Sequence, residues 1–151
     1  MIPSPLLLEC HYFTRVNVEA AADVDSAEAD AGVFKHRIDC KRHKEESRRF
    51  MLTLGLKRVA GKKEGTPHYT WEIEVVGFLT VDAEYPEEKV EALVKVNGPA
   101  VLYAAAREMV ANITSRGPFP AVNLPTVTFV DELTTKTREK TRAAQNIKKK
   151  R

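Results

Sequence analysis

The chain has 151 residues, of which 43% are apolar and 30% are charged, with a formal net charge of +3 at pH 7. This length suits one domain with a single buried core. No apolar run approaches the roughly 18 residues of a membrane-spanning helix, and the opening residues MIPSPLLLECHYF lack the basic start of a secretory signal, so we expect a cytoplasmic protein. Cys10 and Cys40 are too few for a disulfide framework, and we expect two free thiols.

The positive charge is unevenly distributed along the chain. Residues 35–63 hold eleven basic and three acidic side chains, and residues 131–151 hold eight basic and three acidic ones. Acidic residues dominate the stretches 23–30 and 82–91 instead. This asymmetry indicates electrostatic steering of a partner but does not identify the partner.

The first part of the chain alternates apolar and polar residues with the period of β-strands. Four strands are predicted, and their core-facing residues are Leu6, Leu8, Cys10, Tyr12, Val16 and Val18; Phe34, His36, Ile38 and Cys40; Phe50, Leu52, Leu54 and Leu56; and Tyr69, Trp71, Ile73, Val75, Leu79 and Val81. A polar connection, AAADVDSAEADAG, follows the first strand, and a turn, AGKKEGTP, separates the last two. The pattern predicts an antiparallel sheet with one apolar and one polar face.

A helix is predicted from Pro99 to Ser115. Asn97 suits the N-cap, and Pro99 suits the first helical turn, where its missing N–H costs nothing. Apolar residues then recur every three or four positions as far as Ile113, which places them on one stripe. We expect this helix to cover the apolar face of the sheet and to keep part of its stripe for an oligomer interface.

The helix is followed by stop signals. Gly117 suits a left-handed helix end, and Pro118 and Pro120 prevent the helix from resuming, so residues 119–129 are expected to be extended over the surface. A final helix, roughly over 131–146, has almost no apolar stripe.

Two motifs in this region resemble the SecB family of protein-export chaperones. Members carry a helix of the pattern LY-x-x-A-R-E, followed by S-R-G-x-F-P-x-x-N-L-x-x-V-x-F. The matching residues are Leu102, Tyr103, Ala106, Arg107 and Glu108, then Ser115, Arg116, Gly117, Phe119, Pro120, Asn123, Leu124, Val127 and Phe129. The resemblance is strong over 97–130, rests on strand pattern and order over 6–82, and lapses after Leu133.

The resemblance implies an α+β fold, with a four-stranded antiparallel sheet packed by a long helix and a second C-terminal helix. It implies a chaperone domain over 1–133 and a basic tail over 134–151. The expected activity is that of an ATP-independent holdase, which binds unfolded or precursor polypeptides without a cofactor or a metal. Relatives assemble as a homotetrameric dimer of dimers and deliver clients to the motor ATPase SecA.

The resemblance also implies two groups of site residues. The client-binding residues are Trp71, Tyr85, Phe119, Leu124, Val127 and Phe129. The residues of the oligomer interface are Leu102, Ala106, Arg107, Met109, Val110 and Ile113.

The charge of the chain leaves alternatives open. Typical family members are strongly acidic, whereas this chain is net basic. A dedicated chaperone of an antitoxin in a toxin–antitoxin system is therefore an alternative to export service. Nucleic-acid binding through 35–63 and the tail is an alternative of another class, disfavoured because the tail has no aromatic residue and no helix has the pattern of a recognition helix.

Nothing in the sequence predicts catalysis. The four histidines are His11, His36, His43 and His68, and none stands at the spacing of a metal site. The cysteines have no predicted orienting partner, and the glycines form neither a dinucleotide fingerprint nor a phosphate-binding loop. The sequence therefore favours a binding protein over an enzyme.

Overall fold

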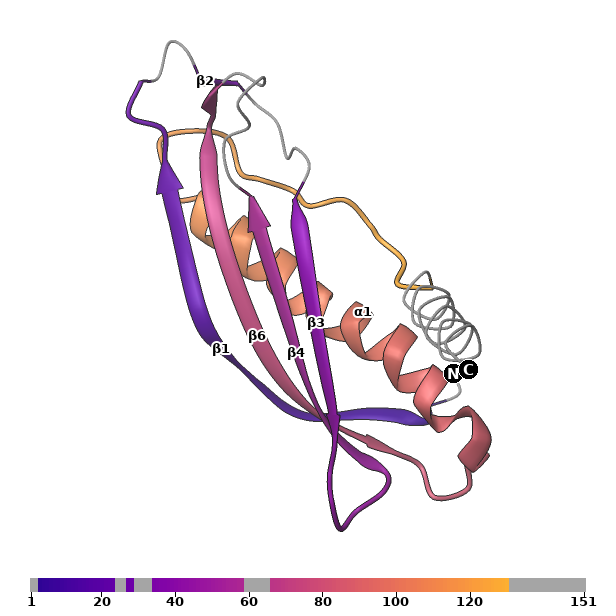
Figure 1. Ribbon diagram of the computed structural model, residues 1–151. Helices are drawn as coiled ribbons and strands as arrows, with labels where there is room; N and C mark the ends of the chain where they lie inside the picture. Colours follow the sequence, from indigo (N-terminus) through magenta and orange to yellow (C-terminus); the bar gives the residue numbers. More distant parts are fainter. Residues whose placement is uncertain (1–2, 24–26, 29–33, 59–65, 131–151) are drawn as a thin grey trace, which may run out of the picture.

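The computed structural model describes residues 3–23, 27–28, 34–58 and 66–130. Its elements are β1 (Leu6–Ala20), β2 (Ala27–Glu28), β3 (Lys35–Arg42), β4 (Arg49–Arg58), β5 (Thr66–Pro67), β6 (Tyr69–Val81) and α1 (Glu87–Thr114). Strands β1, β6, β4 and β3 lie in that order in one antiparallel sheet, and α1 crosses one face of it (Figure 1). The predicted α+β fold is confirmed, while the second helix and the tail expected beyond residue 130 lie outside the described residues.

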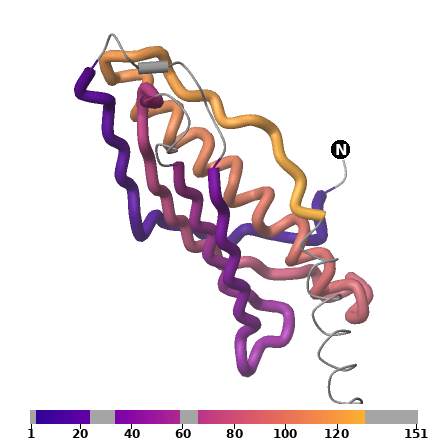
Figure 2. Tube along the Cα trace, turned by 45° about the horizontal axis from the view of Figure 1, so that its top comes forward, coloured from indigo at the N-terminus to yellow at the C-terminus, as the bar shows by residue number. Residues whose placement is uncertain are grey.

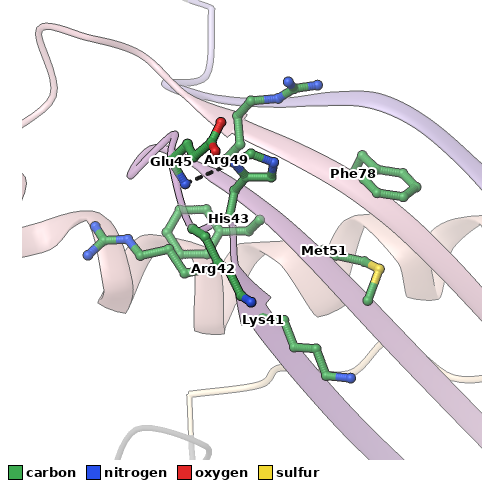
Figure 3. Close-up of a pocket in the computed structure, with 9 residues that line it drawn as sticks. Lys41, Arg42, His43, Glu45, Arg49, Met51 and Phe78 are labelled. Carbon is green, nitrogen blue, oxygen red and sulfur yellow. Dashed lines mark hydrogen bonds between the residues drawn. The ribbon is translucent and has the colours of Figure 1, made fainter.

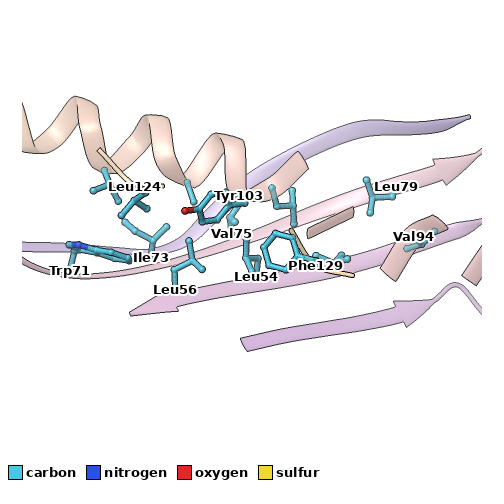
Figure 4. Close-up of a cluster of buried hydrophobic side chains, with 14 of the residues drawn as sticks. Leu54, Leu56, Trp71, Ile73, Val75, Leu79, Val94, Tyr103, Leu124 and Phe129 are labelled. Atoms are coloured by element: carbon cyan, nitrogen blue, oxygen red, sulfur yellow. The ribbon is translucent and has the colours of Figure 1, made fainter. Parts of the chain in front are cut away.

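The core lies between the sheet and α1 (Figure 4). In β4 and β6 every second side chain is buried, and Leu52, Leu54, Ile73 and Val75 have no exposed surface. Strand β3 contributes a half-buried row that includes Ile38. The core-facing residues predicted for β4 and β6 are therefore confirmed, because their alternation is uninterrupted, whereas His36 of β3, at the edge of the sheet, is exposed and not buried as predicted.

Strand β1 departs from its predicted alternation because it is bulged twice. The register against β6 shifts between Leu8 and Cys10 and again between Phe13 and Arg15. Each bulge adds one residue without a partner and so reverses the face on which the following side chains lie. The second bulge undoes the reversal made by the first.

The prediction that Cys10 and Tyr12 face the core is therefore wrong. They pair with the outward-facing residues of β6 and lie on the outer face of the sheet, where Tyr12 is 50% exposed. His11 and Phe13 take the helix-facing positions between the two bulges. Val18, beyond the second bulge, packs against the core as predicted.

Helix α1 begins at Glu87, twelve residues before the predicted start at Pro99. Pro99 lies inside the helix and lacks the N–H that would bond to the carbonyl four residues back, which costs about 3 kcal/mol. Val90 and Val94 are fully buried against the sheet, and each buried valine contributes about 1.5–3 kcal/mol. Burial of the first half of the helix therefore offsets the cost of the proline.

Gly98 lies where α1 packs closely on the sheet. A Cβ atom at this position would be 2.9 Å from methyl groups of both Leu52 and Leu79. A side chain there would push the helix away from strands β4 and β6. In the sequence, the Gly98–Pro99 pair indicates a helix boundary. In the structure, this pair lies inside the helix and allows it to pack closely on the sheet.

Strands β2 and β5 form a short parallel pair at one end of the molecule, which the sequence did not predict (Figure 1). Among the described residues, no helix is long and apolar enough to cross a bilayer.

Candidate functional site

The segment after α1, residues 115–130, turns back along the helix towards the edge strand β3 (Figure 2). The turn closes with the N–H of Gly117 donating to the carbonyl of Thr114 at 3.1 Å. Residues 120–130 lie in neither a helix nor a strand, as predicted for the segment 119–129. We call residues 118–130 the strap.

The strap is anchored by apolar side chains that enter the core. Phe119, Val122, Leu124 and Phe129 are buried, whereas the residues between them are mostly exposed. Phe129 packs edge-on against Tyr103 of α1, with ring centroids 6.0 Å apart. The expectation that this stretch only lies over the surface is therefore wrong for its anchors, which complete the core.

Phe119 sits between two aromatic rings, that of His68, which immediately precedes β6, and that of Tyr69, the first residue of β6. Its ring stacks on His68, with centroids 4.4 Å apart and planes 8° from parallel, and meets Tyr69 edge-on at 5.6 Å. Both arrangements are favourable for aromatic pairs.

Three hydroxyl groups hold the backbone of the strap. The Tyr69 hydroxyl accepts from the N–H of Phe119 at 3.1 Å and lies 3.1 Å from the carbonyls of Thr114 and Phe119, to one of which it donates. The Thr114 hydroxyl accepts from the N–H of Val122 at 2.9 Å. The Tyr103 hydroxyl donates to the carbonyl of Pro125 at 2.7 Å. Burial raises the pKa of Tyr103, which keeps this hydroxyl protonated as a donor.

Gly117 provides the space that the Tyr69 hydroxyl needs. A Cβ atom on Gly117 would lie 2.3 Å from that oxygen. The residue does not adopt the left-handed conformation predicted for it, and the helix ends instead at Ser115 with right-handed dihedral angles. A glycine is needed at this position because the Tyr69 hydroxyl approaches it so closely.

Backbone pairing contributes little to the strap. Apart from the bonds to the three hydroxyls, no backbone hydrogen bond joins residues 120–130 to the rest of the described chain. Segments held by a few side chains open at lower cost than strands of a sheet. The sequence motif locates this segment, but the three hydroxyls that position it were not predicted.

The predicted client-binding residues are gathered around the strap. Trp71, Phe119, Leu124 and Phe129 are buried, Leu124 to within 2% exposure, and Tyr85 and Val127 are half-buried at the margin of the core. The buried indole N–H of Trp71 has no acceptor among the described residues. These residues therefore belong to one apolar core or border it, and the strap covers that core.

The predicted interface residues divide between two faces of α1. Leu102, Ala106 and Val110 have no exposed surface and pack within the protomer. Arg107 is exposed, and Met109 and Ile113 are half-buried. An interface formed by α1 would therefore use the outward face that carries Arg107.

The outer face of the sheet carries interlocked ion pairs. Glu72 binds both Arg15 and Lys57, and its hydrogen bonds from Lys57 and then Arg15 hold its pKa below the usual range. Glu74 accepts from the Thr14 hydroxyl and from Arg37, and these bonds lower its pKa in the same way. These two carboxylates are therefore already paired with cations of the chain itself.

Glu9, the extra residue of the first bulge, belongs to the same pattern. It accepts from the Thr80 hydroxyl and binds Arg49 at 2.9 Å, and these hydrogen bonds lower its pKa.

A hollow of about 580 Å³ opens beside the turn between β3 and β4 (Figure 3). It is lined by Lys41, Arg42, His43, Lys44, Glu45, Arg49, Phe50, Met51 and Phe78. His43 accepts from the N–H groups of Glu45 and Glu46 and so shapes the turn. Among the described residues, no group of histidine, cysteine and acidic side chains could hold a metal ion.

Comparison with known proteins places these features in a family. The family model described as preprotein translocase subunit SecB matches residues 6–140. The protein-export protein SecB of Granulibacter bethesdensis is 26% identical over 62% of this chain and 57% of its own length. SecB of Acidithiobacillus ferrooxidans is 35% identical over 52% of this chain and 50% of its length. The chain thus spans little more than half of these relatives, although SecB of Rhodospirillum centenum is matched over 76% of its length at 25% identity.

A solved structure shares the fold. The SecB-like chaperone Rv1957 of Mycobacterium tuberculosis, in complex with a peptide from the antitoxin HigA1, superimposes with a TM-score of 0.52. The match covers 81% of this chain and 90% of that chain at 16% identity.

Replacing Tyr69 with phenylalanine tests how the strap is held. Tyr69→Phe leaves the buried N–H of Phe119 without an acceptor, so we expect the free energy of unfolding to fall by about 1–3 kcal/mol in urea titrations. Tyr12→Phe is the control, because that hydroxyl lies on the outer face, and should change stability little. Equal stability of Tyr69→Phe and the parent chain would contradict the role of the hydroxyl.

The outer-face carboxylates predict a loss of stability in acid. Because the folded pKa of Glu74 lies below its usual value of 4.5, its contribution is present above that value and is lost as the pH falls through the folded pKa. Glu74→Gln should flatten the decline of stability measured by denaturation from about pH 6 to about pH 3. Glu88→Gln, which removes an exposed carboxylate of α1 outside the sheet, is the control and should change the profile less than Glu74→Gln.

Proposed function

Because the chain belongs to the SecB family of preprotein translocase subunits, we propose that it is an ATP-independent holdase for unfolded polypeptides in protein export. The family consists of chaperones and not of enzymes, which agrees with the absence of a catalytic pattern in the sequence. The observation that carries the proposal is the strap, an extended segment held over an apolar core by side chains and not by strand pairing.

The client would replace the anchors of the strap. An unfolded chain supplies what the strap supplies, an extended backbone with alternating apolar side chains, and could occupy the sites now filled by Leu124, Val127 and Phe129. Trp71 and Tyr85 would then line the opened groove. Shallow apolar subsites of this kind suit many client sequences at modest affinity.

The edge of the sheet beside the strap offers a second type of contact. Strand β3 is the last strand of the described sheet, and His36 contacts Phe129 with ring centroids 6.1 Å apart. A client strand could pair with the backbone of β3 whatever its sequence. We propose that groove and edge act together, since linked weak sites raise the affinity for a long chain.

Two copies of α1 would meet in a dimer of dimers. The outward face of the helix exposes Val101 to 38%, together with Ala104, Arg107 and Glu108. Apolar residues interspersed with charged ones suit a subunit interface. Several client grooves would then share one assembly.

The proposal also concerns the protein that receives the client. The motor ATPase SecA is the recipient that export service requires. The carboxylates Glu72 and Glu74, which could attract a basic partner, are paired within this chain. This charge pattern keeps a dedicated antitoxin chaperone as the second candidate function.

Suppression of aggregation tests the holdase proposal. Without ATP, the chain should keep a chemically unfolded, slow-folding protein from aggregating at both about 0.1 M and about 0.5 M salt, because apolar binding is not screened. Failure at both salt concentrations would remove general client holding and favour a single dedicated client.

A variant at the margin of the core locates the client site. Tyr85→Ser should weaken suppression several-fold, since the half-buried ring of Tyr85 would line the opened groove. Leu7→Ser is the matched control, because it removes an apolar side chain that is 62% exposed on the outer face. Equal losses in the variant and the control would contradict this location.

Arg107→Ala tests the proposed assembly. Loss of a charged hydrogen bond across an interface costs about 1.5–3 kcal/mol, so we expect the sedimentation profile to shift towards smaller species at low micromolar concentration. Lys89→Ala, which also removes an exposed cation from α1, is the control. A sedimentation profile that does not change would remove Arg107 from the interface.

A further inference from the structure

The hollow beside the β3–β4 turn combines an apolar floor with a basic rim, and it lies apart from the strap. We infer that it binds an acidic segment of a partner polypeptide, which inserts one large apolar side chain between Met51 and Phe78. This site goes beyond the holding of unfolded clients, because it recognises charge as well as apolar surface.

The floor is an apolar interruption in a charged surface. Met51 and Phe78 are direct cross-strand partners of β4 and β6 on the outer face, and both are half-buried. The ring of Tyr12 extends the apolar surface, 6.3 Å from the ring of Phe78. Figure 3 shows the side chains of Met51 and Phe78 on neighbouring strands, with Lys41 on the adjoining strand. An incoming apolar side chain would find contacts here that the ion-paired part of the sheet cannot offer.

The rim carries an excess of positive charge. Residues 41–49 contain five lysines and arginines and two glutamates. Arg42 is bound to Glu87 of α1 at 2.7 Å, and Arg49 to Glu46 at 2.9 Å. These pairs fix the wall of the hollow and neutralise their own carboxylates.

Two lysines of the rim are available to a partner. Lys44 forms no ion pair with any described residue, and Lys41 approaches Asp39 only to 3.5 Å in a pair that is more than half exposed. Exposed pairs of this type are weak and exchange readily for a better one. Two carboxylates flanking an apolar side chain would therefore match Lys41 and Lys44 above the floor.

The arrangement favours an acidic polypeptide over a nucleic acid. A nucleic-acid strand presents a long row of phosphates and needs a long row of cations. Glu45 also lines the hollow and interrupts its row of cations, so the site suits a few carboxylates better than a long row of phosphates. The thioether of Met51 offers an apolar side chain a close contact but offers a phosphate nothing.

The probe is a short synthetic peptide of glutamates around a central phenylalanine, fluorescently labelled and titrated into the full chain. We expect saturable binding that weakens as salt rises, with Kd increased about tenfold or more by Lys41→Glu with Lys44→Glu, and about tenfold by Met51→Ser. The charge control is Lys89→Glu, an exposed lysine of α1 outside the hollow, and it should leave Kd unchanged. Lys44→Glu alone, at an exposed turn position, serves if the double variant does not fold.

Three further titrations separate this site from the alternatives. A peptide with lysines in place of glutamates should not bind, and one with alanine in place of phenylalanine should bind several-fold more weakly. Suppression of client aggregation should be unaffected by Lys41→Glu with Lys44→Glu, so the two proposals can fail independently. The inference is overturned if the acidic peptide does not saturate, if Met51→Ser has no effect on it, or if a single-stranded oligonucleotide binds more tightly and ignores Met51→Ser.

Discussion

Helix α1 covers the apolar face of the sheet, and the other features of the molecule depend on how closely it does so. Val90 and Val94 are buried against the sheet in the first half of the helix. Gly98, which has no side chain, leaves room for Leu52 of β4 and Leu79 of β6. The Tyr69 hydroxyl of β6 meets the end of the packed helix at Thr114. The strap starts from this junction, so its path along the helix follows from the packing of α1.

The two faces of the sheet have different kinds of stability. The inner face is apolar and buried, and the free energy needed to expose it rises with every buried side chain. The outer face is held by exposed ion pairs, among them those of Glu72 and Glu74 with arginine and lysine. The strap belongs to neither face: its anchors are apolar, and within the described part of the chain its backbone is bound only to three hydroxyl groups. Segments held in this way open at lower cost than strands of a sheet.

The sequence predicted most of the fold and the extended course of residues 119–129. Strands β4 and β6 alternate without interruption, and a period of two is sufficient to assign their faces. The start of α1 was missed because Pro99 is a strong local signal, whereas the burial that overrides it is tertiary. The role of Tyr69 could not be predicted, since its partners lie 45 and 50 residues away in the chain. The ion pairs of the outer face required the register between strands, which periodicity alone does not provide.

The two bulges of β1 also escaped prediction, because together they restore the original phase and leave Val16 and Val18 where a regular strand would place them. Their consequence concerns how the strand finds its neighbour. A regular strand can slide by two residues along its partner and still bury the same kind of side chain. In β1 such a slip would carry both irregular points away from the places on β6 that accommodate them, and would separate Glu9 from Thr80. The two bulges therefore favour a single alignment of the long edge strand β1 with β6, and slipped pairings are disfavoured during folding.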